Sequence, residues 1–179
     1  EEIDEINRSI SGMRVLKGIE SDILKDGSLD YPPDMLDTFD FVVASIHTHM
    51  DMDKRQMTKR IIKALKNPHT AMLAHPTGRL LLAREPYAVD MDAVMEEAIR
   101  NNVVMELNAN PLRLDIDWRL IDGFVTAGGL IAICPDAHVV EGLDDMRYGV
   151  SMARKGFVKP ESCINTWDAD SLMELLKRP

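Results

Sequence analysis

The stretch Gly129-Leu130-Ile131-Ala132-Ile133-Cys134-Pro135-Asp136-Ala137-His138 decides which fold we expect for this chain. Its apolar run is rich in β-branched residues and follows Gly128, so it predicts a buried strand. Asp136 and His138 come at the end of that strand, and in extended chain their side chains point the same way because strand side chains alternate. A carboxylate and an imidazole aimed together suit Zn²⁺, Mn²⁺ or Fe²⁺, although the same pair also fits a capped turn.

The rest of the chain alternates between strand-like and helix-like segments. Four earlier strands are predicted, at residues 14–20, 39–46, 70–74 and 103–108. Helices are predicted at residues 1–10, 53–65, 90–99, 144–154 and 171–177, with another inside 115–127. Asp53 with Gln56 forms a capping box, Asp90 is a good N-cap, and Asp170 precedes the last helix. Strands that recur at intervals of roughly 25 to 32 residues, with helices between them, predict an α/β fold with a parallel sheet.

The composition limits the classes of protein to which this chain can belong. At 179 residues and 45% hydrophobic, it is long enough for one domain with its own core. The net charge of −9 argues against a broad electrostatic grip on nucleic acid. No apolar stretch approaches the ~20 residues of a membrane span, and no signal peptide is visible. Cys134 and Cys163 form neither a disulfide framework nor a CxxC site, so we expect a cytoplasmic protein with no membrane partner.

Metal-capable side chains follow four of the five predicted strands. In parallel β/α folds the functional groups collect at the carboxyl ends of the strands. The residues at these ends are Glu20, His47, His75 and the pair Asp136 and His138. The remaining strand ends at Asn108-Ala109-Asn110, which is polar but offers no strong ligand. A single histidine here is more often structural, but the set predicts a site for Mn²⁺, Zn²⁺ or Fe²⁺ rather than Ca²⁺.

Two arginines are expected at the same edge of the sheet. Arg79 follows His75 by four residues, and Arg113 follows the fourth strand. A guanidinium can hold a phosphate through two hydrogen bonds, so both are candidate phosphate contacts. The alternative for each is an ordinary solvated loop arginine.

Several motifs together resemble a known family. They are Gly18-Ile19-Glu20, Ala44-Ser45-Ile46-His47, His75-Pro76-Thr77-Gly78-Arg79-Leu80-Leu81, Asn108-Ala109-Asn110-Pro111 and Asp136-Ala137-His138. In this order they resemble the PHP (polymerase and histidinol phosphatase) domain. The stretch from Gly142 to Gly149 makes the chain more similar to the C-terminal PHP domain of bacterial and archaeal family X DNA polymerases.

The resemblance implies a distorted (β/α)7 TIM-like barrel with up to three divalent metal ions. By position, its metal ligands would be Glu20, His47, His75, Asp136 and His138. No Ser or Cys nucleophile is placed for covalent catalysis, so attack by a metal-activated hydroxide on a phosphate ester is expected. Family members attached to polymerases trim DNA 3′ ends and cut at abasic sites, and others dephosphorylate histidinol phosphate.

The chain departs from the family pattern at its start. The HxH motif of the first barrel strand is absent, and His47-Thr48-His49 does not replace it because its context matches a later motif. We therefore expect residues 1–179 to be one PHP domain lacking roughly its first two strands, with polymerase domains in the same parent chain. Three functions stay open: DNA 3′-end processing and abasic-site cleavage, histidinol-phosphate phosphatase activity, and a structural fragment that is inactive alone.

Overall fold

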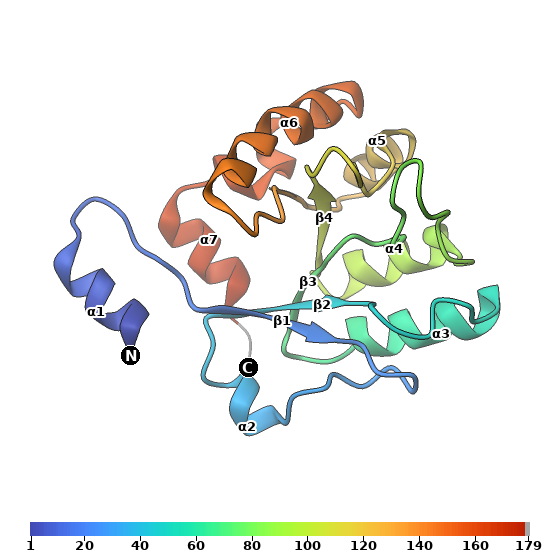
Figure 1. The fold of residues 1–179 in the computed structure, drawn as a ribbon, viewed down its shortest axis with the longest axis horizontal. Coiled ribbons are helices and arrows are strands. Elements are labelled where there is room, and N and C mark those ends of the chain that lie inside the picture. The colour runs from blue at the N-terminus through green and yellow to red at the C-terminus, as the bar shows by residue number, and fades with distance from the viewer. Residues whose placement is uncertain (178–179) are drawn as a thin grey trace.

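The computed structural model describes residues 1–177, and a single parallel sheet lies at its centre (Figure 1). Its strands are β1 (Gly18–Asp22), β2 (Phe41–Ser45), β3 (Thr70–Leu73), β4 (Val104–Asn108) and β5 (Ile131–Cys134). They follow one another in chain order across the sheet. The predicted α/β class with a parallel sheet is thus confirmed. Within the described residues no pairing joins β1 to β5, so closure into a barrel stays a prediction.

The first strand differs from its predicted position. It begins at Gly18 and runs two residues past Glu20, which we expected to be its last residue. The residues before Gly18 bind other partners: the Asn7 amide pairs with the backbone of Val15, and the Lys17 amide donates to Asp40. These side-chain contacts hold the chain outside the sheet, so an extended pattern there does not become a strand.

The helices are α1 (Glu2–Ser9), α2 (Pro33–Leu36), α3 (Lys54–Leu65), α4 (Met91–Arg100), α5 (Trp118–Thr126), α6 (Met146–Lys155) and α7 (Ala169–Leu176), with 3₁₀ turns at Val140–Asp145, Pro160–Ser162 and Ile164–Thr166. The helices lie between the strands in chain order, except that α1 precedes β1 and lies apart from the sheet (Figure 1) and that α6 and α7 follow β5. Asp53 and Asp90 cap α3 and α4 as predicted, because their carboxylates accept from backbone amides three residues later. The last helix begins earlier than predicted, and its cap is Asp168 rather than Asp170. None of the described helices is long and apolar enough to cross a membrane.

The two faces of the sheet are covered unequally. Helices α3 to α6 supply the larger core, and α7 lies on the other side of the strands (Figure 1). The strand residues that face the larger core include Val42, Ala44, Leu73, Met105, Leu107, Ile131 and Ile133. A smaller cluster of Met72, Val104, Ala132 and Ile164 packs with Leu172 and Leu175 of α7. We call the side with this smaller cluster the inner face.

The pairing of β1 with β2 sets the position of the first polar side chains. Gly18 pairs with Phe41, Glu20 with Val43, and Asp22 with Ser45. The Phe41 ring lies so close to Gly18 that a Cβ there would collide with it. A side chain at residue 18 would therefore displace the Phe41 ring. Because all five strands are parallel, their carboxyl ends form a single edge.

Candidate metal centre

Three predicted ligands meet at the carboxyl edge of the sheet. Glu20 comes from β1, His47 follows β2, and His75 follows β3. The Glu20 Oε1 atom lies 3.1 Å from His75 Nε2 and 3.4 Å from His47 Nε2. One ligand atom from each residue fits within 4.8 Å of the others, and residues 1–177 contain no other such group of three. The strand-end argument thus brings together residues that are far apart in sequence.

His75 is the buried member of this cluster, with a side chain only 4% exposed. Burial alone would lower the pKa of His75, but the hydrogen bond to Glu20 and the negative charge of Glu106 outweigh it, so the pKa is raised. Its Nδ1 is the one buried side-chain nitrogen or oxygen without a hydrogen-bond partner among the described residues. Nδ1 of His75 is therefore a polar atom whose hydrogen bond no described residue supplies.

Glu20 is the shared member of the cluster. The hydrogen bond from His75 lowers the pKa of Glu20 to about 2, against the opposing effect of burial. Its carboxylate is therefore ionised over the whole physiological range, as a metal ligand must be. His47 and Glu20 are each about two-fifths exposed, with values of 43% and 42%. The cluster is thus open on one side and closed by His75 on the other.

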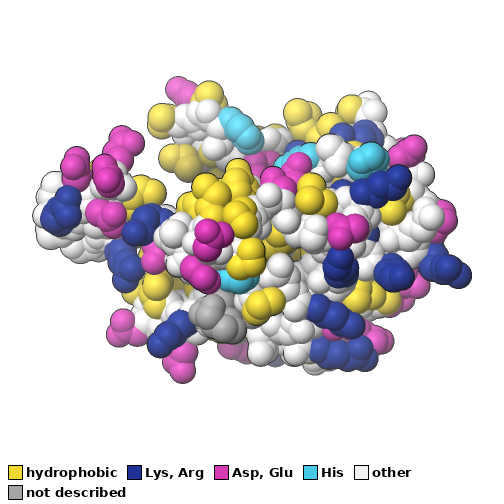
Figure 2. All heavy atoms as spheres, turned by 90° about the horizontal axis from the view of Figure 1, so that it is seen from below, with side chains coloured by type: hydrophobic (Ala, Val, Ile, Leu, Met, Phe, Trp, Pro, Cys, Tyr) yellow, Lys and Arg dark blue, Asp and Glu magenta, His cyan; other side chains and the backbone are white. Residues whose placement is uncertain are grey.

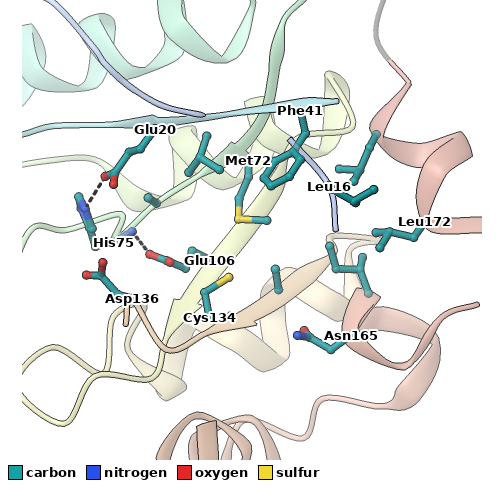
Figure 3. A pocket seen from close by; sticks show the side chains of 15 residues that line it. Leu16, Glu20, Phe41, Met72, His75, Glu106, Cys134, Asp136, Asn165 and Leu172 are labelled. Atoms are coloured by element: carbon teal, nitrogen blue, oxygen red, sulfur yellow. Dashed lines mark hydrogen bonds and ion pairs between the residues drawn. The ribbon is translucent and has the colours of Figure 1, made fainter. Parts of the chain in front are cut away.

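Asp136 lies beside the cluster rather than in it. Its carboxylate is 19% exposed and accepts from the Asn108 amide at 3.1 Å, and Arg113 Nε lies 3.3 Å away. Figure 3 shows the carboxylate next to His75 and Glu106. Asp136 and His75 both have positive φ, of 53° and 26°. Such conformations in residues other than glycine are uncommon and cluster at functional sites.

His138 does not join the other four. Its side chain is 85% exposed, and its Nδ1 lies against the carbonyl of Asp136 at 2.8 Å. The expectation that Asp136 and His138 lie on extended chain is not met, although His138 Nδ1 still lies 3.8 Å from Asp136 Oδ1. Strand β5 ends at Cys134, and the positive φ of Asp136 turns the backbone. A ligand role for His138 stays a prediction.

Sequence reasoning missed Glu106, which lies in β4 and faces the same side as Glu20. Its Oε2 accepts from the backbone amide of His75 at 2.5 Å (Figure 3). It also accepts from the Asn108 side-chain amide at 3.3 Å. Burial raises the pKa of Glu106 to about 7, although the amide of His75 opposes the shift. The available signal was a single acidic residue between the apolar residues Met105 and Leu107 of a predicted strand.

The two arginines differ in how they are engaged. Arg79 donates to the carbonyl of Arg113 at 3.0 Å, to the carbonyl of Leu114, and to Asp117 at 2.8 Å. It therefore joins the loop after β3 to the loop after β4. Arg113 instead lies against Asp136, next to the cluster. For both residues, a phosphate contact stays a prediction.

A cavity of about 340 Å³ opens from the cluster along the inner face. Its polar end is formed by Glu20, His75, Glu106 and Asp136. Its apolar part is lined by residues of the strands and of α7, among them Phe41, Met72 and Leu172 (Figure 3). The surface seen in Figure 2 shows hydrophobic side chains gathered near the middle of one face, beside acidic and histidine side chains.

The residues present fit a divalent metal ion. A neutral imidazole nitrogen and a carboxylate oxygen that face each other as bare acceptors repel, so a proton or a cation must lie between them. Without a metal, His75 supplies this proton by donating from Nε2 to Glu20 Oε1; a divalent ion in its place could bind Glu20 Oε1 together with Nε2 of His47 and of His75. Nitrogen and oxygen ligands without thiolate match Mn²⁺, Zn²⁺ or Fe²⁺. The geometry therefore supports a metal site, while metal identity and number stay open.

Glu106 makes the stability of the metal-free protein depend on pH. In the folded protein the pKa of Glu106 is about 7, above the ordinary 4.5. Its contribution to the free energy of unfolding is therefore fully present below pH 4.5 and is lost as pH rises through 7. Glu106→Gln is expected to remove this loss, which is on the order of 3 kcal/mol. Urea unfolding with a chelator at pH 5 and pH 8 measures it. If the free energy of unfolding changes by the same amount in wild type and variant between pH 5 and pH 8, the expectation is contradicted.

Comparison with known proteins finds relatives of two kinds. Over 177 residues the chain is 42% identical to a Bacillus subtilis (strain 168) protein named DNA polymerase/3'-5' exonuclease PolX, across 99% of this chain and 31% of that protein. Over 178 residues it is 28% identical to a probable phosphatase of Thermoanaerobacter sp. (strain X514), across 94% of this chain and 70% of the relative.

A third relative is a probable phosphatase of Caldicellulosiruptor saccharolyticus. It is 33% identical over 111 residues, which cover 58% of this chain and 42% of that protein. No family model matches the chain. The chain thus spans less than a third of the length of the PolX relative, and a larger share of the first phosphatase.

Proposed function

We propose that this chain is a metal-dependent phosphoesterase domain of the PHP type. The observation that carries the proposal is the convergence of Glu20, His47 and His75 at the carboxyl edge of a parallel sheet. Relatives named polymerase/exonuclease and probable phosphatase support the same reaction class, since both kinds of name describe hydrolysis of phosphate esters. We also propose that the five-stranded sheet is part of the barrel of this family, which two further strands outside residues 1–179 would complete.

Within this site the residues have separable roles. A divalent ion, when bound, supplies a nucleophile near neutral pH and neutralises charge that develops on the phosphate. Glu20, His47 and His75 would hold it, and Asp136 with His138 would complete a larger centre. Arg113 lies beside Asp136, and in this proposal it would orient a phosphate group. Arg79 would have to exchange its loop carbonyls for such a contact.

The finer proposal is processing of DNA 3′ ends, with abasic-site cleavage, in a parent chain that also carries polymerase domains. It is supported by 42% identity along almost the whole chain to the PolX protein. The acidic charge of −9 fits this role only if other segments hold the DNA, because phosphates repel such a surface.

The second candidate is a phosphatase for a small ester such as histidinol phosphate. The probable phosphatases favour it, because one of them is matched over 70% of its length. The 340 Å³ cavity beside the cluster could take such a molecule. An inactive structural fragment is the third possibility, and it predicts no turnover at all.

One set of assays separates these functions. The 179-residue chain and a longer form extended upstream are each given excess Mn²⁺ with 3′-labelled DNA, abasic DNA and histidinol phosphate. The longer form is expected to release nucleotides from DNA 3′ ends and to stop when the metal is chelated, and the short chain is expected to be nearly inactive. Preference for histidinol phosphate would favour the second candidate. Hydrolysis unaffected by chelation would contradict the metal-dependent mechanism.

A further inference from the structure

His47 lies between two carboxylates of the same strand. Its Nδ1 is 2.5 Å from Asp22 Oδ1, and its Nε2 is 3.4 Å from Glu20 Oε1. Glu20 and Asp22 are two residues apart in β1, so strand alternation directs both side chains to one side. The imidazole of His47 therefore meets one carboxylate at each nitrogen.

The contact with Asp22 decides which nitrogen of His47 carries the proton. An ionised carboxylate can only accept, so at 2.5 Å Nδ1 must be the donor. A neutral His47 then has its lone pair on Nε2, the nitrogen that faces Glu20. This is the nitrogen that a metal ion in the cluster needs.

Ser45 provides a competing partner for the same nitrogen. Its hydroxyl lies 3.4 Å from His47 Nδ1, and a hydroxyl can donate as well as accept. With Asp22 present, the shorter, charge-assisted bond is stronger. Without Asp22, the hydroxyl of Ser45 can donate to Nδ1 while Nε2–H donates to Glu20. The lone pair of Nε2 is then no longer available.

We propose that Asp22 is a positioning residue that holds His47 with its proton on Nδ1 and so keeps Nε2 free to bind a metal ion. The inference rests on the proposed metal site and gives a role to a residue outside the three-member cluster. Removal of an outer partner of a metal-binding histidine typically costs about 10–100-fold in metal affinity. The structure therefore predicts a loss of that size for Asp22→Ala.

Two measurements on the 179-residue chain test the proposal. The ¹⁵N chemical shifts of the His47 ring, read in metal-free protein at mildly alkaline pH, report which nitrogen carries the proton. The signal is assigned by its absence in His47→Gln. Titration with Mn²⁺ and Zn²⁺ gives metal affinity. Asp22→Ala should move the proton of His47 to Nε2 and weaken metal binding about 10–100-fold. Asp22→Asn keeps an accepting oxygen and should lie between Asp22→Ala and wild type.

The matched control is Asp37→Ala. Asp37 Oδ1 contacts His69 Nε2 at 2.9 Å, a carboxylate–imidazole pair away from the cluster, and its loss should leave metal affinity unchanged. If Asp22→Ala does not fold, Asp22→Asn carries the test because it preserves shape. Unchanged His47 shifts and unchanged affinity in the Asp22 variants would overturn the proposal. Absence of metal binding by wild type, or wild-type binding that survives His47→Gln, would instead contradict the metal site itself.

Discussion

Replacement of His75 by alanine is expected to lower metal affinity by more than about 100-fold, because even an outer partner of a ligand is worth about 10–100-fold. Its Nε2 lies 3.1 Å from Glu20 Oε1, so its loss leaves the cluster with two members. The hydrogen bond from the residue's backbone amide to Glu106 does not involve the imidazole and should persist. Calorimetric titration with Mn²⁺ measures affinity, and phosphoester turnover should fall with it.

His69→Ala is the control for this variant. His69 precedes β3, whereas His75 follows it, and its ring contacts Asp37 and Asn67 rather than the cluster. Its removal should leave metal affinity within about threefold, since a substitution away from the ligands usually changes free energies by no more than about 0.5 kcal/mol. Equal loss in both variants would mean that histidine removal acts through folding, and the site assignment would then be wrong.

Arg60→Met is expected to destabilise the fold by on the order of 3 kcal/mol, because it leaves buried carbonyls without a donor. Arg60 is a buried residue of α3 whose guanidinium donates to the carbonyls of Ile23, Leu24 and Thr48. It thereby joins the loop after β1 to the loop after β2, the two segments that follow Asp22 and His47. The midpoint temperature of thermal unfolding should fall by about 6–12 °C for a chain of this size.

Arg55→Met on the same helix separates the effect of the contacts from the effect of charge. Arg55 is exposed, so its replacement should change stability by no more than about 0.5 kcal/mol. If Arg60→Met proves equally mild, the carbonyls must find water or other donors. The account of Arg60 as the link between the two loops would then fail.

Periodicity predicted the order and type of most elements, because the buried sides of strands and helices leave a repeating apolar pattern. It failed where side chains far apart in sequence decide the outcome. The start of β1 depends on Asn7 and Asp40, which bind the segment before Gly18. The short helix α2 was not predicted, since four residues are too few to show a helical period.

The residues of the candidate site also fall into those that the sequence predicts and those that it does not. The convergence of Glu20, His47 and His75 could be predicted because the carboxyl ends of parallel strands lie at one edge of the sheet. Glu106 was missed because its direction depends on strand parity, which becomes visible only when its neighbours Met105 and Leu107 are seen in the larger core. For His138 the argument assumed extended chain beyond Cys134, where β5 ends and the positive φ of Asp136 turns the backbone.

The pairing of β1 with β2 also makes the site a check on correct folding. A slip of one residue between these strands would send Glu20 and Asp22 to the opposite face, because strand side chains alternate. A slipped sheet would hold no metal ion at His47. Metal added during folding would bind only the correctly paired sheet and raise its share of the population. The proposed metal ligands thus also favour the correct register of β1 and β2 over a register shifted by one residue.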